Sequence, residues 1–414
     1  MARTHKYLYS IGLFTSLIIH ANSFVWADEI PTDWQGIRST GMGDAFTAVG
    51  NDETAPFSNP AGLSRTRNPR AKAYVHKVAF PGLVVGGNDL AISGVNKGKT
   101  KPLQLVPKLA DSVKSNNKKT GYIEGQMYPS IIFGNRSSAT FLLGFPSRSF
   151  ASIQQKDTTN FDTVNVRAQT TVGAVLGIAS MSRGGTIGYG LSVRPNVRYS
   201  YEGNLPSKSV TLQELKTEER TNGVRSAAVA GDVGMLITAG DFWLPTVGLS
   251  VRNIPTGCVE KYVNPVTGDL QTVCGVLRSG APVGASSDAL LDPTEVRLGI
   301  AITPRFNLSG TRANIRISAD AWPLPVIIKS KSYGITNINV NRLLHAGAEL
   351  YFGNAFLQNG IGFRAGSNQG QLCYGASLKL IGIAFEYSYY GVDTGSSKVA
   401  KIESRHLIGI TGDW

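Results

Sequence analysis

Residues Gly41–Arg65 read GMGDAFTAVGNDETAPFSNPAGLSR, directly after an apolar leader and before a long series of short alternating segments. Small residues crowd this stretch. The run Asn59-Pro60-Ala61-Gly62 predicts a helix start in which Asn59 is the cap and Pro60 lies in the first turn. The stretch is too short and too mixed in character to form a domain alone. It is therefore expected to pack inside a structure that the following residues build.

The first 27 residues predict a cleaved signal peptide. Arg3 and Lys6 give a positively charged start, Ile11–Ile19 supply an apolar core, and Val25-Trp26-Ala27 fits a cleavage site. The alternative is an uncleaved membrane anchor, which the shortness of the apolar core disfavours. Residues 1–27 are accordingly excluded from the fold, and the chain is expected to be exported.

The composition and the local pattern favour an all-β protein. Gly reaches 47 residues, charged residues only 17% and aromatic residues 9%, and long helical periodicity is scarce. Between Val296 and Thr303 the apolar residues Val296, Leu298 and Ile300 alternate with Arg297 and small or polar residues. This period of two predicts strands with one apolar face and one polar face. Alternation alone does not distinguish a soluble sandwich from a membrane barrel.

The connections between the predicted strands favour an outer-membrane barrel. About fourteen strands are predicted, an even number as in bacterial outer-membrane barrels, near 71–80, 125–135, 138–150, 163–182, 185–201, 224–239, 243–254, 294–304, 312–322, 342–353, 356–366, 370–379, 381–390 and 404–414. Short turns, including Phe306 to Gly310, fall at one end, and longer links fall around 81–124, 151–162, 202–223, 255–293, 323–341 and 391–403. The terminal Trp414 of an alternating last strand is typical of barrels delivered to the barrel assembly machinery. The fold class predicted is a transmembrane antiparallel β-barrel.

Closure follows from hydrogen bonding, because a sheet in hydrocarbon has no water to satisfy its edges. If the apolar faces contact lipid, the opposite faces line the lumen. The charged residues expected there include Arg297, Arg316, Asp320, Glu349, Arg364 and Glu386. Two interpretations remain open. In the first, which we prefer, these charges neutralise one another and fill the barrel; in the second, some line a solute path or hold an internal plug.

The connections carry further expectations. Cys258 and Cys274 flank a segment that a disulfide would close in an oxidising compartment; the alternative is two free thiols. Lysines concentrate between Lys97 and Lys119, and the net charge is +13. We attribute this charge to a loop facing solvent or anionic lipid rather than to nucleic-acid binding. Short helices are expected at Val106–Val113 and Leu212–Thr221.

Enzymatic motifs are lacking from the sequence. There is no G-x-S-x-G nucleophile elbow and no H-E-x-x-H metal motif, and the five His residues are dispersed. The sequence has no C-x-x-C motif and no His-rich cluster that would indicate a metal site. We therefore expect no enzyme, no cofactor and no metal site.

The motif GMGDAF at 41–46, followed by NPAGL at 59–63, resembles the start of mature chains in the FadL-like group of outer-membrane transporters. This group comprises long-chain fatty-acid and aromatic-hydrocarbon transporters, with PorV-type and TraF-type barrels as relatives. The resemblance implies a barrel of about fourteen strands at 70–414, with an N-terminal hatch at 28–69 in its lumen. It also implies lateral exit of hydrophobic ligands. The hatch residues that it indicates, structural or gating, are Gly41, Gly43, Asp44, Phe46, Asn59, Pro60, Ala61 and Gly62.

The leading functional hypothesis is a hatch-gated outer-membrane channel for hydrophobic or amphipathic, fatty-acid-like small molecules in a Gram-negative-type bacterium. The expected partners are outer-membrane lipid or lipopolysaccharide, the ligand itself and the barrel assembly machinery. The alternative is a non-transporting barrel that scaffolds protein secretion or conjugation, with a protein partner at the extracellular loops. Asn59-Pro60-Ala61-Gly62 is interpreted as a structural turn in preference to a ligand site.

Overall fold

The structure is a computed structural model. It describes residues 34–66, 75–96, 120–134, 139–154, 163–206, 212–240, 243–263, 270–279, 291–308, 311–324, 326–329, 331–333, 340–354, 359–393 and 402–413. The predicted signal peptide, the lysine-rich segment Lys97–Lys119, the helix expected at Val106–Val113 and Trp414 lie outside these residues. Within the described residues, no helix is long and apolar enough to cross a membrane.

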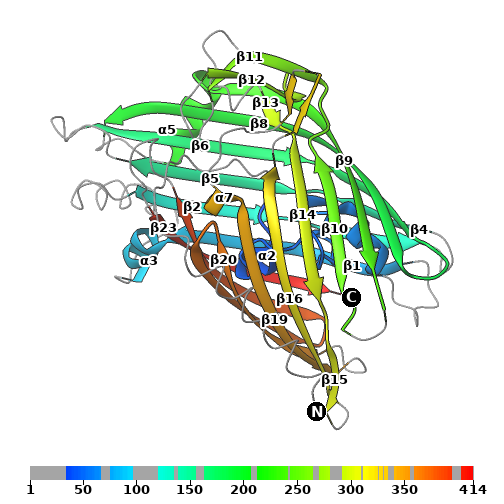
Figure 1. The fold of residues 1–414 in the computed structure, drawn as a ribbon. Coiled ribbons are helices and arrows are strands. Elements are labelled where there is room, and N and C mark those ends of the chain that lie inside the picture. Colours follow the sequence, from blue (N-terminus) through cyan, green and yellow to red (C-terminus); the bar gives the residue numbers. More distant parts are fainter. Residues whose placement is uncertain are drawn as a thin grey trace.

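The described strands form a closed antiparallel barrel of 14 strands, which confirms the predicted fold class (Figure 1). Several of its strands are interrupted and carry two labels. In order around the barrel they are β1 (Val75–Asn88), β2 (Thr120–Met127) with β3 (Ser130–Gly134), β4 (Ala139–Gly144) with β5 (Ser147–Gln154), β6 (Thr163–Gly173) with β7 (Val175–Met181), β8 (Ile187–Pro206), β9 (Val224–Thr238), β10 (Thr246–Arg252), β14 (Glu295–Ile302) with β15 (Arg305–Leu308), β16 (Thr311–Leu324), β19 (Leu344–Asn354), β20 (Asn359–Asn368), β21 (Gln371–Leu380), β22 (Ile383–Asp393) and β23 (Ile402–Asp413).

The barrel closes between its first and last strands. β1 pairs antiparallel with β23, and the register places Val84 opposite Gly409 and Val85 opposite Ile408. Within the described residues, every strand of the ring therefore has two hydrogen-bonded neighbours, so the ring has no open edge there.

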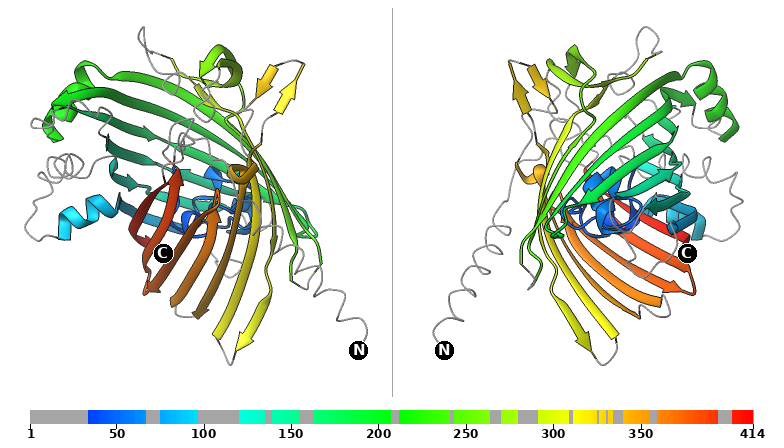
Figure 2. Two further views of the ribbon diagram at one scale, coloured as in Figure 1. Left: turned by 60° about the vertical axis from the view of Figure 1, so that its left-hand side comes forward. Right: turned by 90° about the vertical axis from the view of Figure 1, so that its right-hand side faces the viewer.

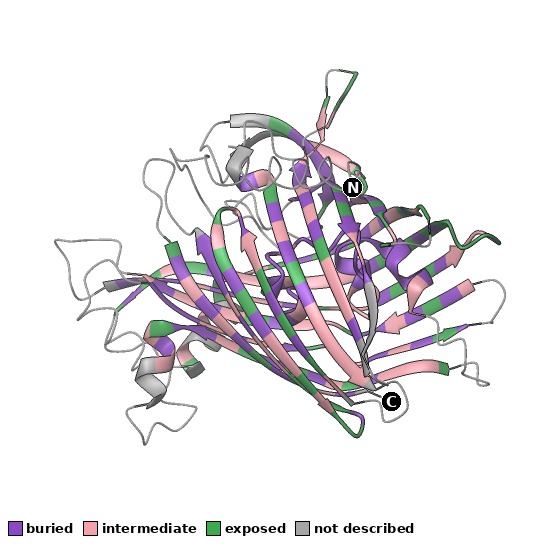
Figure 3. Ribbon diagram, turned by 60° about the horizontal axis from the view of Figure 1, so that its bottom comes forward, coloured by how far each residue is buried: buried purple, intermediate pink, exposed green. Residues whose placement is uncertain are grey.

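The alternation predicted from the sequence becomes an inside and an outside (Figure 3). On β14, Leu298 is 45% exposed and Ile300 47% exposed, whereas Arg297, which precedes Leu298, is 5% exposed. Large apolar side chains are exposed in the same way on most of the other strands. An apolar outer surface around a polar interior is the surface that a transmembrane barrel presents to lipid.

Two predicted strand ends are wrong. The first strand was expected to end at Phe80, but β1 continues through Pro81 to Asn88, because a bulge between Phe80 and Leu83 absorbs the proline without ending the strand. The turn expected from Phe306 to Gly310 is shorter, because β15 continues to Leu308 and still pairs with β16.

The prediction that all short turns lie at one end is also wrong. The turn at Gln369 and Gly370 joins β20 to β21 at the end where the long connections lie, which we call the long-loop end. Its φ angles are 53° and 82°, as in the two-residue turns that match strand twist.

The long connections are partly ordered. Helix α5 (Leu212–Thr221) has the bounds predicted from the sequence. The link expected at 255–293 instead contributes three strands to a second, small sheet, the outer sheet. It comprises β11 (Gly257–Val263), β12 (Leu270–Leu277), β13 (Leu291–Pro293), β17 (Val326–Ile328) and β18 (Lys331–Tyr333). A disulfide joins Cys258 on β11 to Cys274 on β12.

Residues 34–66 run through the interior of the barrel and are called the luminal segment (Figure 2). It contains helix α2 (Ile37–Gly41) and the 3₁₀ helices η1 (Ala55–Phe57) and η2 (Pro60–Arg65). Helix α2 contacts β20 to β23, and η2 contacts β4, β7, β8 and β9 on the other side of the barrel. Helices α3 (Asp89–Asn96) and α7 (Val340–Leu343) lie at the long-loop end.

Candidate functional site: the luminal segment and its contacts with the wall

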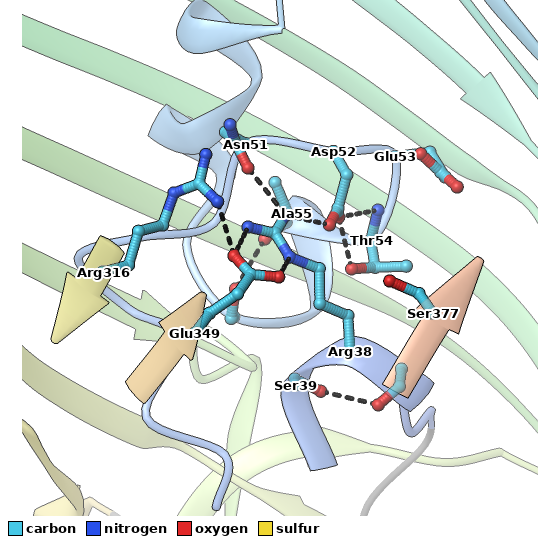
Figure 4. Close-up of polar contacts among 12 residues, drawn as sticks. Arg38, Ser39, Asn51, Asp52, Glu53, Thr54, Ala55, Arg316, Glu349 and Ser377 are labelled. Carbon is cyan, nitrogen blue, oxygen red and sulfur yellow. Dashed lines mark hydrogen bonds and ion pairs between the residues drawn. The ribbon is translucent and has the colours of Figure 1, made fainter. Parts of the chain in front are cut away.

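Arg38 of helix α2 connects three parts of the interior (Figure 4). Its Nε and Nη2 donate to the two carboxylate oxygens of Glu349 on β19, at 2.8 and 2.7 Å. Its Nη1 donates to Asn51 Oδ1 at 2.7 Å and to Asp52 Oδ2 at 2.8 Å, both in the loop that precedes η1. A bidentate pair of this kind fixes orientation as well as distance, so Arg38 holds α2, its own loop and the wall together.

Three arginines surround Glu349. Besides Arg38, Arg316 on β16 donates to Oε2, and Arg364 on β20 donates to Oε1 at 3.0 Å. Arg364 also reaches Glu386 Oε1 on β22 at 3.2 Å. With Asp52 included, this Arg38 network holds three guanidinium groups and three carboxylates, so its formal charge is balanced. Buried charges are tolerated when they are paired in this way.

The charge pairs of the Arg38 network shift the pKa values of Arg38 and Asp52. Burial alone lowers the pKa of Arg38, but Glu349 and Asp52 outweigh it and the pKa lies above its ordinary value. Burial raises the pKa of Asp52, and Arg38, Thr54 and Lys77 reverse that rise, so the pKa lies below 3.8. Both groups are therefore charged at neutral pH.

The other two expected luminal residues lie in a second contact region. Asp320 on β16 accepts a hydrogen bond from the backbone N–H of Thr47 at 2.7 Å. Arg297 donates to Glu295 Oε2 and lies 3.8 Å from the centre of the Trp322 ring. The structure thus brings four of the six into the Arg38 network, and Asp320 separately contacts the luminal segment.

Trp322 and His345 hold the turn at Gly43 and Asp44. Their rings stack with centroids 4.2 Å apart. His345 Nδ1 lies 3.0 Å from the carbonyl oxygen of Gly43, and Trp322 Nε1 donates to the carbonyl oxygen of Asp44 at 3.3 Å. Burial raises the pKa of the Asp44 carboxyl, and Arg297 offsets only part of this rise.

Asn59 caps η2 as the sequence predicts. Its Oδ1 accepts from the N–H of Ala61 at 3.0 Å. Its Nδ2 donates to the carbonyl oxygens of Thr47 at 2.9 Å and Met235 at 3.2 Å. The side chain therefore ties the helix start to the luminal segment and to β9, which is a structural role.

Glycines of the wall allow the luminal segment to approach the strands closely. A Cβ at Gly248 would lie 2.6 Å from the carbonyl oxygen of Thr47, and Cβ atoms at Gly234 and Gly347 would overlap Asn59 and Met42. Gly43 also has a φ of +64°, which a residue with a side chain adopts with strain. The wall glycines that face the segment are Gly177, Gly188, Gly190, Gly234, Gly248, Gly299, Gly347, Gly366, Gly375 and Gly409.

The remaining expected residues also contact the wall or the segment's own core. Gly41 lies against Gly375, and Phe46 is 1% exposed and packs beneath the Arg38 guanidinium, 5.1 Å from its ring centre. Pro60, Ala61 and Gly62 are buried in η2. All eight residues indicated by the resemblance thus lie inside the barrel.

A row of interruptions crosses five adjacent strands. Pro81 lies in β1, Pro129 between β2 and β3, Pro146 between β4 and β5, Ala174 between β6 and β7, and Pro195 in β8. We call this the proline row. Hydrogen bonds still link neighbouring strands across it, such as Phe145 N to Pro129 O at 3.0 Å. Each proline lacks an N–H, however, and so removes one donor from the ladder.

Aromatic side chains and a cavity lie on the inner side of the proline row. The rings of Trp34, Phe57 and Tyr128 pack with centroids 5.1 to 5.5 Å apart. A cavity of about 20 Å³, enough for one water molecule, is bounded by Trp34 and Phe57 and by Pro146 of the wall. On the outer side, Phe145 is 52% exposed. The inner side of the row thus carries aromatic rings together with the buried Arg148 and Arg194, which also line the cavity.

Sequence reasoning missed several residues of this site. Arg38 lies just before the stretch that small residues mark out, and its partner Glu349 is 311 positions away. Trp34 and Trp322 carry no motif. The sequence does show Trp34 and Arg38 shortly before the small-residue stretch Gly41–Arg65. That pattern is common to many proteins and assigns no role to either residue.

The fold and its internal segment define a transmembrane β-barrel whose lumen is occupied by its own N-terminal region. The sequence matches no protein-family model and no curated protein. Among solved structures, the barrel is similar to the Pseudomonas putida toluene transporter TodX, with a TM-score of 0.50, 12% identity and 92% and 99% of the two chains covered.

Two further solved structures are similar. A TodX monoaromatic hydrocarbon channel carrying the deltaS2 mutation gives a TM-score of 0.50 at 12% identity, with 92% of this chain and 99% of that chain covered. The Ralstonia pickettii toluene transporter TbuX gives 0.46 at 12% identity, with 92% and 97% covered. The TodX likeness confirms, at the level of the fold, the resemblance that the sequence motifs indicated.

Proposed function

We propose that the protein is an outer-membrane channel for hydrophobic or amphipathic small molecules and that the luminal segment is its hatch. The observation that carries the proposal is the Arg38 network, which fastens a short separate segment across the interior by charge pairs. Such pairs form and break as units, because a single unpaired buried charge is unfavourable. TodX, a toluene transporter by its printed description, has the same fold and supports an apolar cargo. No enzymatic activity is included in the proposal.

Lateral exit completes the proposed route. Moving an apolar solute from water into lipid is favourable by roughly 25 cal/mol per Å² of its surface, so release into the bilayer is preferred to release into water. The proline row is the place we assign to this exit, since its ladder has fewer donors and its inner side is lined by Trp34, Phe57 and Tyr128.

A disulfide lock tests the hatch. The hydroxyl oxygens of Thr40 on α2 and Ser388 on β22 are 2.8 Å apart and both side chains are buried. Thr40→Cys with Ser388→Cys, in a Cys373→Ser background, fastens the segment to the wall when oxidised. The flux of toluene into proteoliposomes should fall at least tenfold on oxidation and recover on reduction.

The matched control is Asn165→Cys with Asn204→Cys, which joins two wall strands where the side chains already meet at 3.2 Å. This lock should leave flux unchanged. Equal flux through the oxidised and reduced forms of the hatch lock would contradict the proposal.

A second lock tests the exit separately. Met127 on β2 is opposite Ser147 on β5, beside the proline row. Met127→Cys with Ser147→Cys should slow transfer of toluene into the bilayer while the hatch remains free. If the hatch lock reduces flux and the second lock does not, the result supports gating by the hatch and contradicts lateral exit at the proline row.

The scaffolding function is a second candidate, favoured by the outer sheet. Strand β17 lies at the edge of that sheet, and Ile327 and Ile328 are 67% and 52% exposed. An exposed edge strand is a template for pairing with another chain. A photo-crosslinker at Ile327 that captures one protein reproducibly in intact cells would support scaffolding, and capture of lipid alone would count against it. Recognition by the barrel assembly machinery stays a prediction.

A further inference from the structure

Two small cavities border the stacked rings of Trp34 and Phe57. The cavity beside Pro146, which we call the wall cavity, reaches the proline row. A second cavity of about 20 Å³, the inner cavity, is bounded by Asp44 of the luminal segment and by Trp322 of the wall. Trp34 and Phe57 are the described residues that line both cavities. The two rings therefore form a partition between the inner cavity and the proline row.

The partition is closed in this structure. The centroids of the Trp34 and Phe57 rings are 5.5 Å apart, the ring planes are inclined by 28°, and both residues are buried. Each cavity has room for about one water molecule, which is less than a single benzene ring occupies. An aromatic solute is therefore excluded from this route while both rings are in place.

The two rings belong to differently attached halves of the luminal segment. Trp34 directly precedes Gln35, whose side-chain oxygen accepts a hydrogen bond from the Tyr390 hydroxyl on β22 at 2.8 Å. Helix α2 follows and contacts β20 to β23. Phe57 ends η1, which packs against η2, and η2 contacts β4, β7, β8 and β9. A movement of α2 relative to β22 therefore draws Trp34 away from Phe57.

Trp34 is the less firmly held of the two rings. The backbone N–H of Phe57 donates to the carbonyl oxygen of Thr54 at 2.9 Å, and the Arg194 guanidinium lies 5.9 Å from the Phe57 ring centre. The indole Nε1 of Trp34 is buried and, among the residues that the structure describes, has no hydrogen-bond partner. A buried donor without an acceptor is unfavourable. The indole therefore loses no hydrogen bond when it leaves this position.

We propose that Trp34 is the stopper of the exit and that its side chain sets the size of the largest solute that passes. When α2 moves, the indole leaves the partition, and the inner cavity and the wall cavity join into one passage that ends at the proline row. Phe57 stays in place as the fixed side of that passage. This assignment rests on the proposed transport function, and it names the residue of the hatch on which passage and size selection depend.

The test measures flux into proteoliposomes for two hydrocarbons, toluene and the bulkier triisopropylbenzene. Trp34→Ala removes the partition, so it should raise toluene flux several-fold and admit triisopropylbenzene, which the wild type excludes. Trp34→Phe keeps a smaller ring against Phe57 and should restore most of the exclusion of triisopropylbenzene. A purely structural role for Trp34 would reduce the yield of folded barrel, identified by its heat-modifiable migration, without changing the size limit.

Phe150→Ala is the matched control. Phe150 on β5 stacks on Tyr122 with centroids 5.9 Å apart and lines neither cavity. Its removal deletes an aromatic ring of similar size without opening the partition, so both fluxes should equal those of the wild type. Equal flux and an equal size limit in Trp34→Ala and the wild type would overturn the assignment of the stopper.

The hatch lock separates this assignment from the proposed function. In the oxidised Thr40→Cys, Ser388→Cys lock, α2 is fastened to β22, and adding Trp34→Ala should restore toluene flux. If the lock lowers flux and Trp34→Ala does not restore it, the result supports the hatch and rejects Trp34 as its stopper. If the lock has no effect while Trp34→Ala still raises flux and the size limit, the result supports the stopper and contradicts gating by movement of α2.

Discussion

Arg38 in the luminal segment and Glu349 on β19 are 311 positions apart in the sequence, yet they share two hydrogen bonds of 2.8 and 2.7 Å. The Glu349 side chain is 1% exposed and the Arg38 side chain 15% exposed. This bidentate pair is the centre of the connection between the internal segment and the wall, because Arg316 and Arg364 depend on the same carboxylate.

Glu349→Gln should release the luminal segment. Three guanidinium groups lose their shared negative charge, and removing one partner of a buried pair destabilises by about 3–5 kcal/mol. Hydrogen exchange in α2 should accelerate accordingly. The exchanged pair Arg38→Glu with Glu349→Arg should not restore protection, since Arg316 and Arg364 would then face a third arginine. Restored protection in that double variant would show that the pair acts alone.

Gly234→Ala should displace the segment without altering the strand itself. Its Cβ would overlap the side chain of Asn59, and overpacking of this kind costs about 1–3 kcal/mol. Gly125→Ala is the matched control, because no atom lies within 4 Å of the Cβ that it adds. Protease cleavage of the luminal segment should increase only for Gly234→Ala. Equal cleavage in both variants would argue against close packing as the cause.

Asn59→Asp should be no better tolerated than Asn59→Ala, although Asp is a good cap elsewhere. Asp keeps the acceptor for the N–H of Ala61, but it places a charged oxygen against the carbonyls of Thr47 and Met235, where Asn59 donates. Loss of the cap alone costs about 0.5–2 kcal/mol. The thermal midpoint of the folded barrel measures both changes, and a midpoint for Asn59→Asp at the wild-type value would refute the donor role.

Two aspartates of the luminal segment should give its stability opposite responses to acid. The pKa of Asp44 is raised, so its burial is unfavourable while it is ionised, and stability increases as the pH falls through that pKa. The pKa of Asp52 is lowered below 3.8, so its contribution is present above that value and is lost as the pH falls through the folded-state pKa. Protection of α2 from exchange should therefore pass through a maximum between the folded-state pKa values of Asp52 and Asp44.

The variants separate these two contributions. Asp44→Asn should remove the increase in protection on mild acidification, and Asp52→Asn should remove the loss at lower pH while reducing protection at neutral pH. A wild-type profile that declines steadily from neutral pH, without a maximum, would contradict the assignment to Asp44.

Much of the fold was predictable because it depends on local pattern. The alternation around Leu298, the cap at Asn59 and helix α5 each follow from neighbouring residues. The continuation of β1 past Phe80 and of β15 to Leu308 was not predictable, since pairing with the next strand carried both strands into positions that were expected to be connections. The turn at Gln369 and Gly370 was missed because a two-residue loop leaves little signal between two alternating segments.

The sequence by itself determined which side chains of each strand face inward, because that choice repeats every two residues along one strand. It also marked the small-residue stretch that became part of the luminal segment. Only the tertiary structure decided which inward charges meet. The level at which Arg316, Glu349 and Arg364 align depends on the register between three strands and on the seating of Arg38 among them, a property of the closed barrel that no segment of the chain contains.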